Sequence, residues 1–369
     1  FLELRGQWIP GLETVLEKTQ DVRKIAVIIL NWNGWQDTVE CLESLNRSTI
    51  SDFTTIVVDN GSNDDSLEKI RAWIEALNSG NEENNSRPLT EFDREQIPAD
   101  ISSITDEIAG ELPQFVLINN GENLGFAGGN NVGIRFTLWA GNDTILLLNN
   151  DTTVAPDCLK QLLSFMEENK KYAVVTPMIC YYYEPDTVWN CGGKLTWWGS
   201  RKYYHRDQKA DECPHGHREI SFITGCALMA RADIFRKYGL LSEQFFLGEE
   251  DYEFSLRMSR EGVAMAAVPQ SCVFHKVSRA KESVFGDDAL PSAFIHHLNR
   301  FIDLKGHYHP LYWKVWRIFS LGYIIPMLRI RHGIPIWRVM KFSSLLLNYS
   351  TRKNSVTSED FFQAKELFN

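Results

Sequence analysis

The sequence lacks the cysteine pattern of a disulfide-rich protein. Its seven cysteines are an odd number, they are scattered along the chain, and no two of them form a CxxC pair. A secreted disulfide framework needs paired cysteines, so this class is disfavoured. Unpaired cysteines are typical of a reducing compartment, and we therefore expect the protein in the cytoplasm.

The sequence also lacks a surplus of basic residues. Lys and Arg number 38 against 48 Asp and Glu, which gives a formal net charge of −10. Proteins that bind nucleic acids usually carry a basic patch, so we expect no nucleic-acid partner. The longest hydrophobic run near the C-terminus is short and interrupted, so we also expect no segment that spans a bilayer.

The chain does contain the alternation of strands and helices that is typical of an α/β protein. Apolar runs, each followed by polar residues, occur at residues 25–30, 54–58, 114–118 and 145–148. Such runs predict strands buried on both faces, and helical patterns lie between them. The repetition predicts a mostly parallel central sheet flanked by helices.

Composition divides the 369 residues into three parts. We expect a lead-in at residues 1–24, an α/β domain at 25–285 and a helical, basic and aromatic extension at 286–369. Within the domain, residues 78–113 form an acidic insertion with nine acids and two arginines. Solvated surface decoration and a lid over a site both stay open as interpretations of this insertion.

The stretch Thr144–Val154 carries the first candidate site residues. Its strand ends at Asn149, Asn150 and Asp151. Ligands of open α/β sheets bind beyond the carboxyl ends of the strands. Asn150 and Asp151 therefore either meet a ligand or only turn the chain before the helix that Pro156 begins, and the stretch alone favours neither.

A second candidate group lies at residues 245–257. Three consecutive acids, Glu249, Glu250 and Asp251, stand where an apolar segment becomes a helix. The helix dipole stabilises acids in a first turn, so this position alone has a structural explanation. The alternation at residues 220–230 predicts one further strand before this helix.

His275 follows another strand-like run. Strand ends in a parallel sheet meet at one edge, where we expect four side chains to converge: Asp59, Asp151, Asp251 and His275. An acidic site with one imidazole fits a divalent cation and a ligand that carries phosphate.

Glycines and aromatic residues give weaker signals. The glycine-rich segment at residues 119–134 has neither the GxGxxG nor the GxxxxGK[ST] spacing, so a dinucleotide site and a P-loop are both weakly supported. Tyrosines and tryptophans gather at residues 181–204, where they either stack on sugar or base rings or pack as core.

Seven motifs follow one another along residues 25–280. They are VIILNWNG (27–34), VVDNGSNDDS (57–66), NNGENLGFAGGNNVGI (119–134), LLLNNDTTV (146–154), ITGCALMARADIF (223–235), FFLGEEDYEFSLR (245–257) and the segment around His275. In this order they resemble glycosyltransferase family 2, and most of all its rhamnosyltransferase-like subgroup. The resemblance implies the GT-A fold, a single nucleotide-binding α/β domain merged with an acceptor-binding part.

The resemblance implies a donor pocket at the strand ends. Asn31 and Asn33 would lie beside the nucleotide, and Asp59 would contact its base or ribose. The other donor-binding residues that the resemblance implies are Asn123, Gly125, Asn130 and Asn150.

It also implies metal-binding and catalytic roles. Asp151 matches the last acid of the DxD motif, which holds Mg²⁺ or Mn²⁺ against the donor diphosphate, and His275 resembles a histidine that completes this site. Asp251, with Glu250 beside it, matches the acid that serves as general base.

Two positions depart from the family pattern. Asn149 stands where the DxD motif has its first acid, so one carboxylate reaches the metal and we expect weaker metal binding. The extra acid Glu249 leaves the choice of base open within residues 249–251. There is no QxxRW motif, which disfavours a processive membrane-embedded synthase.

These residues predict an inverting, metal-dependent glycosyltransferase. It would move a sugar, rhamnose by the resemblance, from a nucleotide-diphosphate sugar to a hydroxyl of a glycan or lipid-linked acceptor in cell-surface polysaccharide synthesis. A sugar-phosphate nucleotidyltransferase and a non-catalytic sugar-binding module are the alternatives. The first should have a basic phosphate loop, but residues 31–36 contain no Lys or Arg; the second has no need for Asp151 and Asp251.

The extension beyond residue 286 lies outside the resemblance. Residues 289–305 have helical periodicity, and residues 311–350 mix aromatic with basic side chains, while Asp303 is the only acid between 301 and 353. This composition predicts one of two arrangements: contact with a membrane at its inner face, or helices that pack on the catalytic domain or on a second copy in a homodimer. A metal site is disfavoured because tetrahedral ligand spacing is absent among His296, His297, His307 and His309.

Overall fold

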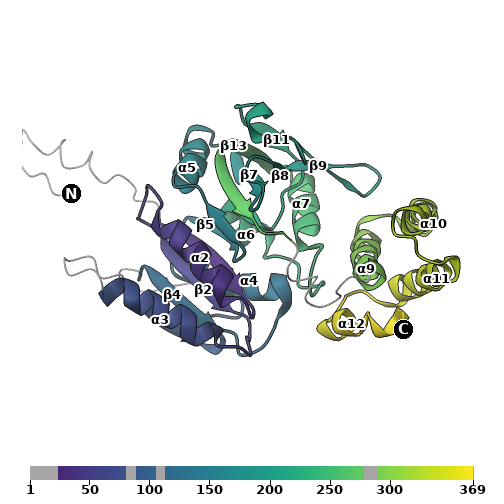
Figure 1. Cartoon of the computed structure of the whole chain (residues 1–369), viewed down its shortest axis with the longest axis horizontal. Coiled ribbons are helices and arrows are strands. Elements are labelled where there is room, and N and C mark those ends of the chain that lie inside the picture. Colours follow the sequence, from purple (N-terminus) through teal and green to yellow (C-terminus); the bar gives the residue numbers. More distant parts are fainter. Residues whose placement is uncertain (1–23, 80–88, 105–112, 278–288, 369) are drawn as a thin grey trace, which may run out of the picture.

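The computed structural model describes residues 24–79, 89–104, 113–277 and 289–368. These residues form an α/β domain with a group of C-terminal helices beside it (Figure 1). In the described ranges, no helix combines the length and the apolar composition that crossing a bilayer requires. The predicted lead-in lies outside these ranges except for residue 24, as do residues 80–88 and 105–112 of the predicted insertion.

Eleven strands form the central sheet. They are β1 (Ile25–Asn31), β2 (Thr54–Asp59), β3 (Leu89–Asp93), β4 (Phe115–Asn119), β5 (Thr144–Asn149), β6 (Thr152–Val154), β7 (Tyr172–Tyr181), β8 (Val188–Asn190), β11 (Arg218–Ile220), β12 (Ala227–Arg231) and β13 (Ala264–His275). The spatial order is β11-β13-β7-β12-β5-β1-β2-β4-β3, with β6 paired to β13 and β8 to β7. The five strands from β5 to β3 are parallel, as are β7 and β13, whereas β12 is antiparallel to both of its neighbours.

Helices cover both faces of the sheet. Val27 and Ile29 of β1 belong to a core with α2, α3 and α5, whereas Ala26 and Ile28 belong to a core with α4, α6 and α7. Successive side chains of a strand point to opposite faces, so continuous apolar runs suit strands covered on both sides. The helix bounds are α2 (Trp35–Asn46), α3 (Ser66–Ser79), α4 (Gly125–Trp139), α5 (Cys158–Glu168), α6 (Ala232–Tyr238) and α7 (Glu250–Arg260).

The C-terminal helices pack around a third hydrophobic core, distinct from the two cores of the sheet. Phe222, Phe245 and Tyr252 of the α/β domain also belong to this third core. The extension is therefore helical, as predicted, and it packs on the α/β domain next to the start of α7. Its elements are α9 (Ala289–His307), α10 (Pro310–Pro326), the π-helix η4 (Met327–Arg331), α11 (Ile336–Arg352) and α12 (Ser358–Gln363). Short 3₁₀ helices are η1 (Arg94–Gln96), η2 (Ile101–Ser103), η3 (Ala210–Glu212) and η5 (Glu366–Phe368).

Two regions differ from the sequence prediction. The prediction of a single strand at residues 220–230 is wrong. β11 ends at Ile220 on the outer side of β13, whereas β12 begins at Ala227 between β5 and β7. Residues 221–226 therefore cross from one position in the sheet to the other. Residues 89–93, within the predicted acidic insertion, form β3, the edge strand beside β4. The hairpin of β9 (Gly193–Leu195) and β10 (Arg201–Tyr203) is separate from the main sheet.

Candidate active site

The carboxyl ends of β1, β2 and β5 lie side by side. Asn31 pairs with Asp59 in the register of β1 and β2, and Leu30 pairs with Asn149 in the register of β1 and β5. Parallel pairing therefore places Asn31, Asp59 and the 149–151 segment at one edge of the sheet, where ligands of α/β proteins bind.

Asp59 is fully buried, and its carboxylate holds the loop that follows β2. Asn31 Nδ2 donates to Oδ1 over 2.7 Å, Ser62 Oγ donates to Oδ1 over 2.6 Å, and the Ser62 amide donates to Oδ2 over 3.0 Å. Asn33 joins the same loop, because its amide donates to Ser62 Oγ and its Oδ1 accepts from the amide of Asn63. Contact between Asp59 and a nucleotide would require Asn31 or Ser62 to move.

Asn60, which the sequence analysis missed, connects this loop to the glycine-rich segment. Its Nδ2 donates to Asn123 Oδ1 over 2.9 Å and to the carbonyl of Gly125 over 3.1 Å, and its Oδ1 accepts from Asn120 Nδ2. Asn130 instead bonds to the carbonyl of Phe126 within α4. The signal for Asn60 was its place directly after a strand-end acid.

Gly125 permits a close approach between two of the motifs. Its φ is +75°, and a Cβ there would lie 2.3 Å from the carbonyl oxygen of Phe246. The amide of Phe126 donates to that same carbonyl over 3.0 Å. The start of α4 is thus in contact with the segment that leads to the acids at 249–251, and only glycine fits there.

Asn150 lies at the end of β5 and is bonded toward β1. Its Nδ2 donates to Thr38 Oγ1 over 3.2 Å, and Thr38 Oγ1 donates to Asn31 Oδ1 over 2.8 Å. A chain of hydrogen bonds therefore runs from Asn150 through Thr38 and Asn31 to Asp59.

Asp151 and His275 are brought together, as predicted. His275 Nε2 lies 3.2 Å from Asp151 Oδ1, since β6 and β13 pair with Thr152 opposite His275. The ring of Trp189 packs against the imidazole with its centroid 4.7 Å away.

Both groups have shifted pKa values. Burial would raise the pKa of Asp151, but its hydrogen bond with His275 and the charges of His275 and Lys276 lower it. Burial would lower the pKa of His275, but the Cys226 sulfur and the Asp151 carboxylate raise it to about 10. The pair consequently favours a carboxylate next to an imidazolium when nothing else is bound.

The three acids before and in α7 have different surroundings. The Glu249 side chain is 1% exposed and forms a two-point ion pair with Arg300 of α9. Glu250 is 7% exposed, whereas the Asp251 side chain is 15% exposed. Glu249 is therefore occupied by a structural contact, and Asp251 is the most accessible of the three.

Asp251 has an arginine partner from the β9–β10 hairpin. Arg201 Nη1 lies 3.2 Å from Asp251 Oδ1. Burial would lower the pKa of Arg201, but the charge of Asp251 raises it, so the guanidinium stays charged. Neither Arg201 nor Arg300 is predictable from the sequence, because no local pattern assigns an acid to either of them.

Residues 225 and 226 connect Asp251 with the Asp151–His275 pair. A Cβ on Gly225 would lie 3.9 Å from Asp251 Cβ and 3.1 Å from the ring of Phe126. The next residue, Cys226, lies against His275, and its carbonyl accepts from the amide of Asn149 over 2.9 Å. Asp251 and Asp151 therefore lie on the two sides of residues 225–226. Asp59 lies further along the sheet edge, where its partners are Asn31 and Ser62.

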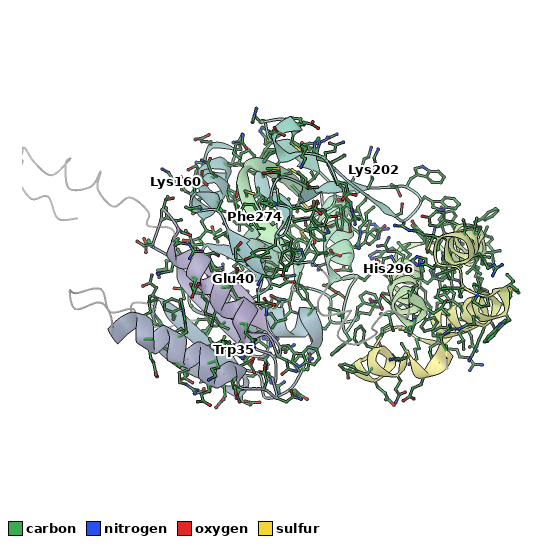
Figure 2. All side chains as sticks on the ribbon, in the orientation of Figure 1. Trp35, Glu40, Lys160, Lys202, Phe274 and His296 are labelled. Carbon is green, nitrogen blue, oxygen red and sulfur yellow. The ribbon has the colours of Figure 1, made fainter. Side chains whose placement is uncertain are left out.

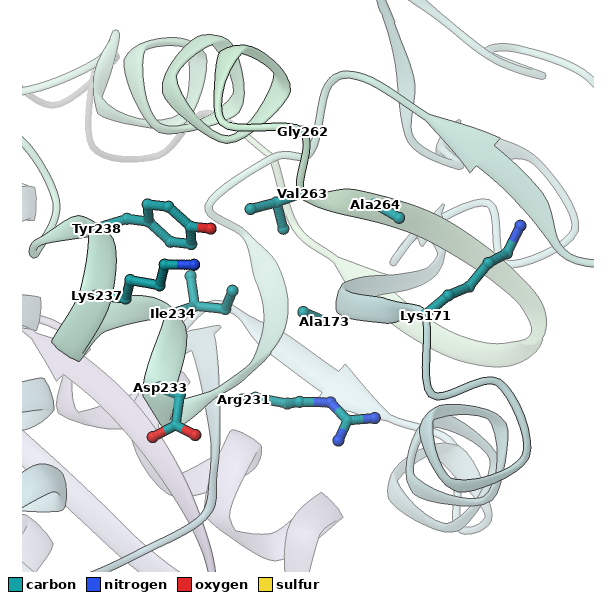
Figure 3. A pocket seen from close by; sticks show the side chains of 10 residues that line it. All are labelled: Lys171, Ala173, Arg231, Asp233, Ile234, Lys237, Tyr238, Gly262, Val263 and Ala264. Carbon is teal, nitrogen blue, oxygen red and sulfur yellow. The ribbon is translucent and has the colours of Figure 1, made fainter.

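A pocket of about 450 Å³ lies elsewhere, at the opposite edge of the sheet (Figure 3). Its lining includes Ala173 at the start of β7, Ala264 at the start of β13 and Arg231 at the end of the antiparallel β12. None of the predicted site residues lines this pocket, so it is separate from the candidate active site.

Comparison with known proteins agrees with this class of fold. The solved structure of GalNAc-T7 with UDP, GalNAc and Mn²⁺ shares the fold with a TM-score of 0.53 and 14% identity, over 78% of this chain and 48% of that one. The fold is accordingly GT-A, the nucleotide-sugar-binding fold predicted from the motifs.

The chain belongs to glycosyltransferase family 2. The model described as "Glycosyltransferase like family 2" matches residues 90–288, and that of "Glycosyl transferase family 2" matches residues 26–87. Among curated proteins, the chain is 26% identical over 156 residues to "Low-salt glycan biosynthesis hexosyltransferase Agl10" of Haloferax volcanii, an alignment that covers 40% of this chain and 47% of the relative. It is 25% identical over 187 residues to "dTDP-rhamnosyl transferase RfbF" of Shigella flexneri, over 50% and 59% of the two chains. The chain thus spans about half the length of these relatives.

Proposed function

We propose that the protein transfers a sugar from a nucleotide-diphosphate sugar to an acceptor hydroxyl, with inversion at the anomeric carbon. The position of Asp251 carries this proposal. It is the most accessible acid of residues 249–251, it lies in the first turn of α7, and Gly225 and Cys226 join it to the Asp151–His275 pair.

In this transfer, the acceptor oxygen bonds to the anomeric carbon as the bond from that carbon to the nucleoside diphosphate breaks. Asp251 takes the hydroxyl proton, a contribution of ~10²- to 10⁴-fold in rate for a well-placed base. Arg201 already donates to Oδ1 of this carboxylate and fixes its orientation, so the acceptor hydroxyl would use Oδ2. Glu250 lies beside the base, and Glu249 holds the loop through Arg300.

Asp151 and His275 fit a divalent cation that the donor helps to hold. Within the described ranges, no three His, Cys, Asp or Glu side chains are grouped closely enough to hold a metal ion by themselves. Mg²⁺ in nucleotide-dependent enzymes is typically held by one or two carboxylates, with phosphate oxygens and water as the other ligands. One carboxylate and one imidazole 3.2 Å apart suit such a shared Mg²⁺ or Mn²⁺, provided that the imidazolium releases its proton when the ion binds. The ion would offset the charge of the departing diphosphate.

This metal assignment predicts that Asp151→Ala loses Mn²⁺-dependent donor binding. Calorimetric titration with the donor nucleotide, with and without Mn²⁺, measures it directly. The matched control is Asp143→Ala, which changes an acid in the turn before β5, at the other end of that strand. Equal donor affinity of Asp151→Ala and the unsubstituted chain in the presence of Mn²⁺ would contradict the assignment.

The names of the relatives guide the choice of donor. One is called a hexosyltransferase and the other a dTDP-rhamnosyl transferase. We assign dTDP-rhamnose as the donor and a hydroxyl of a glycan or lipid-linked acceptor as the recipient, in cell-surface polysaccharide synthesis at the cytoplasmic face of the membrane.

The test is a panel of dTDP-, UDP- and GDP-sugars. Thermal stabilisation in the presence of Mn²⁺ identifies the donor, and NMR of the product then gives the anomeric configuration. We expect stabilisation by one nucleotide class, release of nucleoside diphosphate and an inverted product. Release of pyrophosphate from a sugar phosphate and a nucleoside triphosphate would identify a nucleotidyltransferase instead. Sugar binding without turnover of any donor would identify a binding module.

A further inference from the structure

Helix α10 is apolar on its outer face as well as its inner one. Trp313, Trp316 and Leu321 are buried against the neighbouring helices. The opposite side of the helix is exposed to solvent at six large side chains with helical spacing: Leu311, Tyr312, Val315, Ile318, Phe319 and Tyr323. A soluble surface helix normally carries polar residues on that side.

The exposed apolar surface continues beyond α10. Ile330 in η4 is 84% exposed, and the first turns of α11 expose Ile336, Trp337 and Met340. We call these side chains, together with the outer face of α10, the apolar face. These elements are neighbours, and monomeric soluble proteins rarely expose this many large apolar side chains on adjacent helices without a partner.

The sequence stretch that carries the apolar face has charges of one sign. No Asp or Glu occurs between residues 304 and 353, although the whole chain has a net charge of −10. The same stretch contains nine cations: Lys305, Lys314, Arg317, Arg329, Arg331, Arg338, Lys341, Arg352 and Lys353. Lys314, Arg331 and Lys341 are exposed among the apolar side chains, so the partner of this face should be apolar with an anionic rim.

The β9–β10 hairpin extends the apolar face toward the candidate active site. Its turn carries Trp197, which is 81% exposed, and Trp198, whose ring centroid lies 6.4 Å from that of Phe319. Trp316 Nε1 donates to the carbonyl of Trp198 over 2.9 Å. The hairpin, which carries Lys202, lies beside the C-terminal helices, which carry His296 (Figure 2), and Arg300 Nη1 of α9 donates to the carbonyl of Gly199 in the hairpin turn.

The same hairpin carries Arg201, the partner of Asp251. Three residues lie in the sequence between Trp197, whose indole is exposed, and Arg201, whose guanidinium contacts Asp251. A lipid-linked acceptor bound at the hairpin turn would thus lie a few residues along the hairpin from the arginine that contacts Asp251.

We infer that the apolar face and the hairpin turn bind the surface of an anionic lipid membrane and place Asp251 over an acceptor that is linked to lipid. Exposed Trp, Tyr and aliphatic side chains among Lys and Arg are the composition of helices that lie in a membrane interface. Anionic lipid provides the opposite charge over the whole face. A second copy of the chain docked symmetrically on this face would instead place its cations opposite one another.

The proposed membrane contact is supported by the exposed side chains of the apolar face alone, whereas the placement of Asp251 over a lipid-linked acceptor rests on the proposed function. The first test is flotation of the full chain with vesicles of phosphatidylcholine and with vesicles that also contain phosphatidylglycerol. We expect binding to the anionic vesicles that falls with added salt. Each cation removed near such a surface should weaken binding roughly fivefold.

Two double variants examine the face: Lys314→Glu with Lys341→Glu, and Ile330→Ser with Trp337→Ser. Both should lose vesicle binding by at least roughly tenfold while thermal stabilisation by the donor is kept. The matched control is Lys69→Glu with Lys160→Glu, which makes the same charge change on α3 and α5 (Lys160 in Figure 2) and should bind vesicles like the unsubstituted chain, apart from a small general loss from added negative charge.

Unchanged vesicle binding of both face variants would overturn the inference. The inference would also be overturned if the unsubstituted chain did not bind vesicles and sedimented as a dimer while the face variants were monomeric. The partner of the apolar face would then be a second copy of the chain. Donor stabilisation is measured separately, so vesicle binding without any donor response would reject the proposed function and retain the lipid surface.

Discussion

The loop that leads into α7 has two ends with different surroundings. At its first end, α9 holds the backbone: Asn299 donates to the carbonyls of Leu247 and Gly248, and Arg300 pairs with Glu249. Glu249 has a φ of +113°, which is uncommon for a residue with a side chain, so packing must keep the backbone there.

At the second end, the loop passes into the first turn of α7, which contains Asp251. The side chain of Asp251 is partly exposed and contacts Arg201 of the β9–β10 hairpin. Of the three consecutive acids, Glu249 stabilises the loop, Glu250 is buried, and Asp251 is the one with an accessible carboxylate. The comparison teaches that burial and partner, not position in the motif, decide which carboxylate can serve as a base. Changes at each end should therefore have separable effects on stability and on turnover.

The largest difference between the effect on turnover and the effect on stability is expected from Asp251→Asn at the second end. The amide keeps the shape of the side chain but cannot take the hydroxyl proton, so kcat should fall ~10²- to 10⁴-fold. Donor binding should stay close to that of the unsubstituted chain. The amide oxygen can still accept from Arg201, so the loss of thermal stability should be smaller than for Arg300→Met at the first end. Steady-state kinetics measure the loss, and Glu261→Gln, an exposed acid just after the same helix, serves as the control. Near-normal turnover of Asp251→Asn would show that another group is the base.

At the first end, Arg300→Met leaves Glu249 buried without its partner. The free energy of unfolding should fall by about 3–5 kcal/mol, because an uncompensated buried charge is costly. Denaturant titration measures this change, and the exposed Arg352→Met should cost under about 0.5 kcal/mol. Adding Glu249→Gln to Arg300→Met should recover part of the loss. If Arg300→Met and Arg352→Met were equally stable, the buried pair would not stabilise the loop.

Gly125→Ala changes the contact that joins α4 to the same loop. The new Cβ would meet the carbonyl of Phe246 at 2.3 Å, whereas Gly121 has a similar φ of +69° and nothing within 4 Å of a Cβ. Both alanine variants therefore have backbone strain, but only the first has the clash. We expect Gly125→Ala to be less stable than Gly121→Ala by about 1–3 kcal/mol in thermal unfolding. Equal stabilities of the two variants would show that the backbone around Phe246 moves aside at little cost in free energy.

The smallest effect concerns pH and His297 of α9, the helix that holds the first end. Burial, and then the charge of Arg300, lower the pKa of His297 from 6.5 to about 4. A group with a folded pKa below its unfolded pKa contributes stability above the unfolded value, and this stability is lost as the pH falls from about 6.5 toward 4. Between pH 7 and 5 the loss should be about 1–2 kcal/mol. His297→Gln should remove this part of the pH dependence, and an unaltered profile would assign it to other groups.

The sheet edge of the site is predictable from sequence for a physical reason. Continuous apolar runs end at Asn31, Asp59 and Asp151, and parallel pairing brings such ends together. His275 is predictable in the same way, because β13 ends at that residue and pairs with β6 just after Asp151.

The arginines are not predictable in this way. Arg201 and Arg300 meet their acids across 50 and 51 residues of sequence, and neither follows a strand-end pattern. Strand β3 is missed because LTEFD is short, half-exposed and contains two acids, which is ordinary for an edge strand but not distinguishable from a surface loop. Long-range partners and edge strands depend on the assembled structure.

The ion pair between Glu249 and Arg300 also determines how this chain can be recombined with other members of its family. The matched family region ends at residue 288, so Glu249 lies inside it and Arg300 lies twelve residues beyond its end. A hybrid that joined the first 288 residues to the C-terminal helices of another member would inherit a buried carboxylate. It would fold well only if the incoming helix supplied an arginine at the place of Arg300.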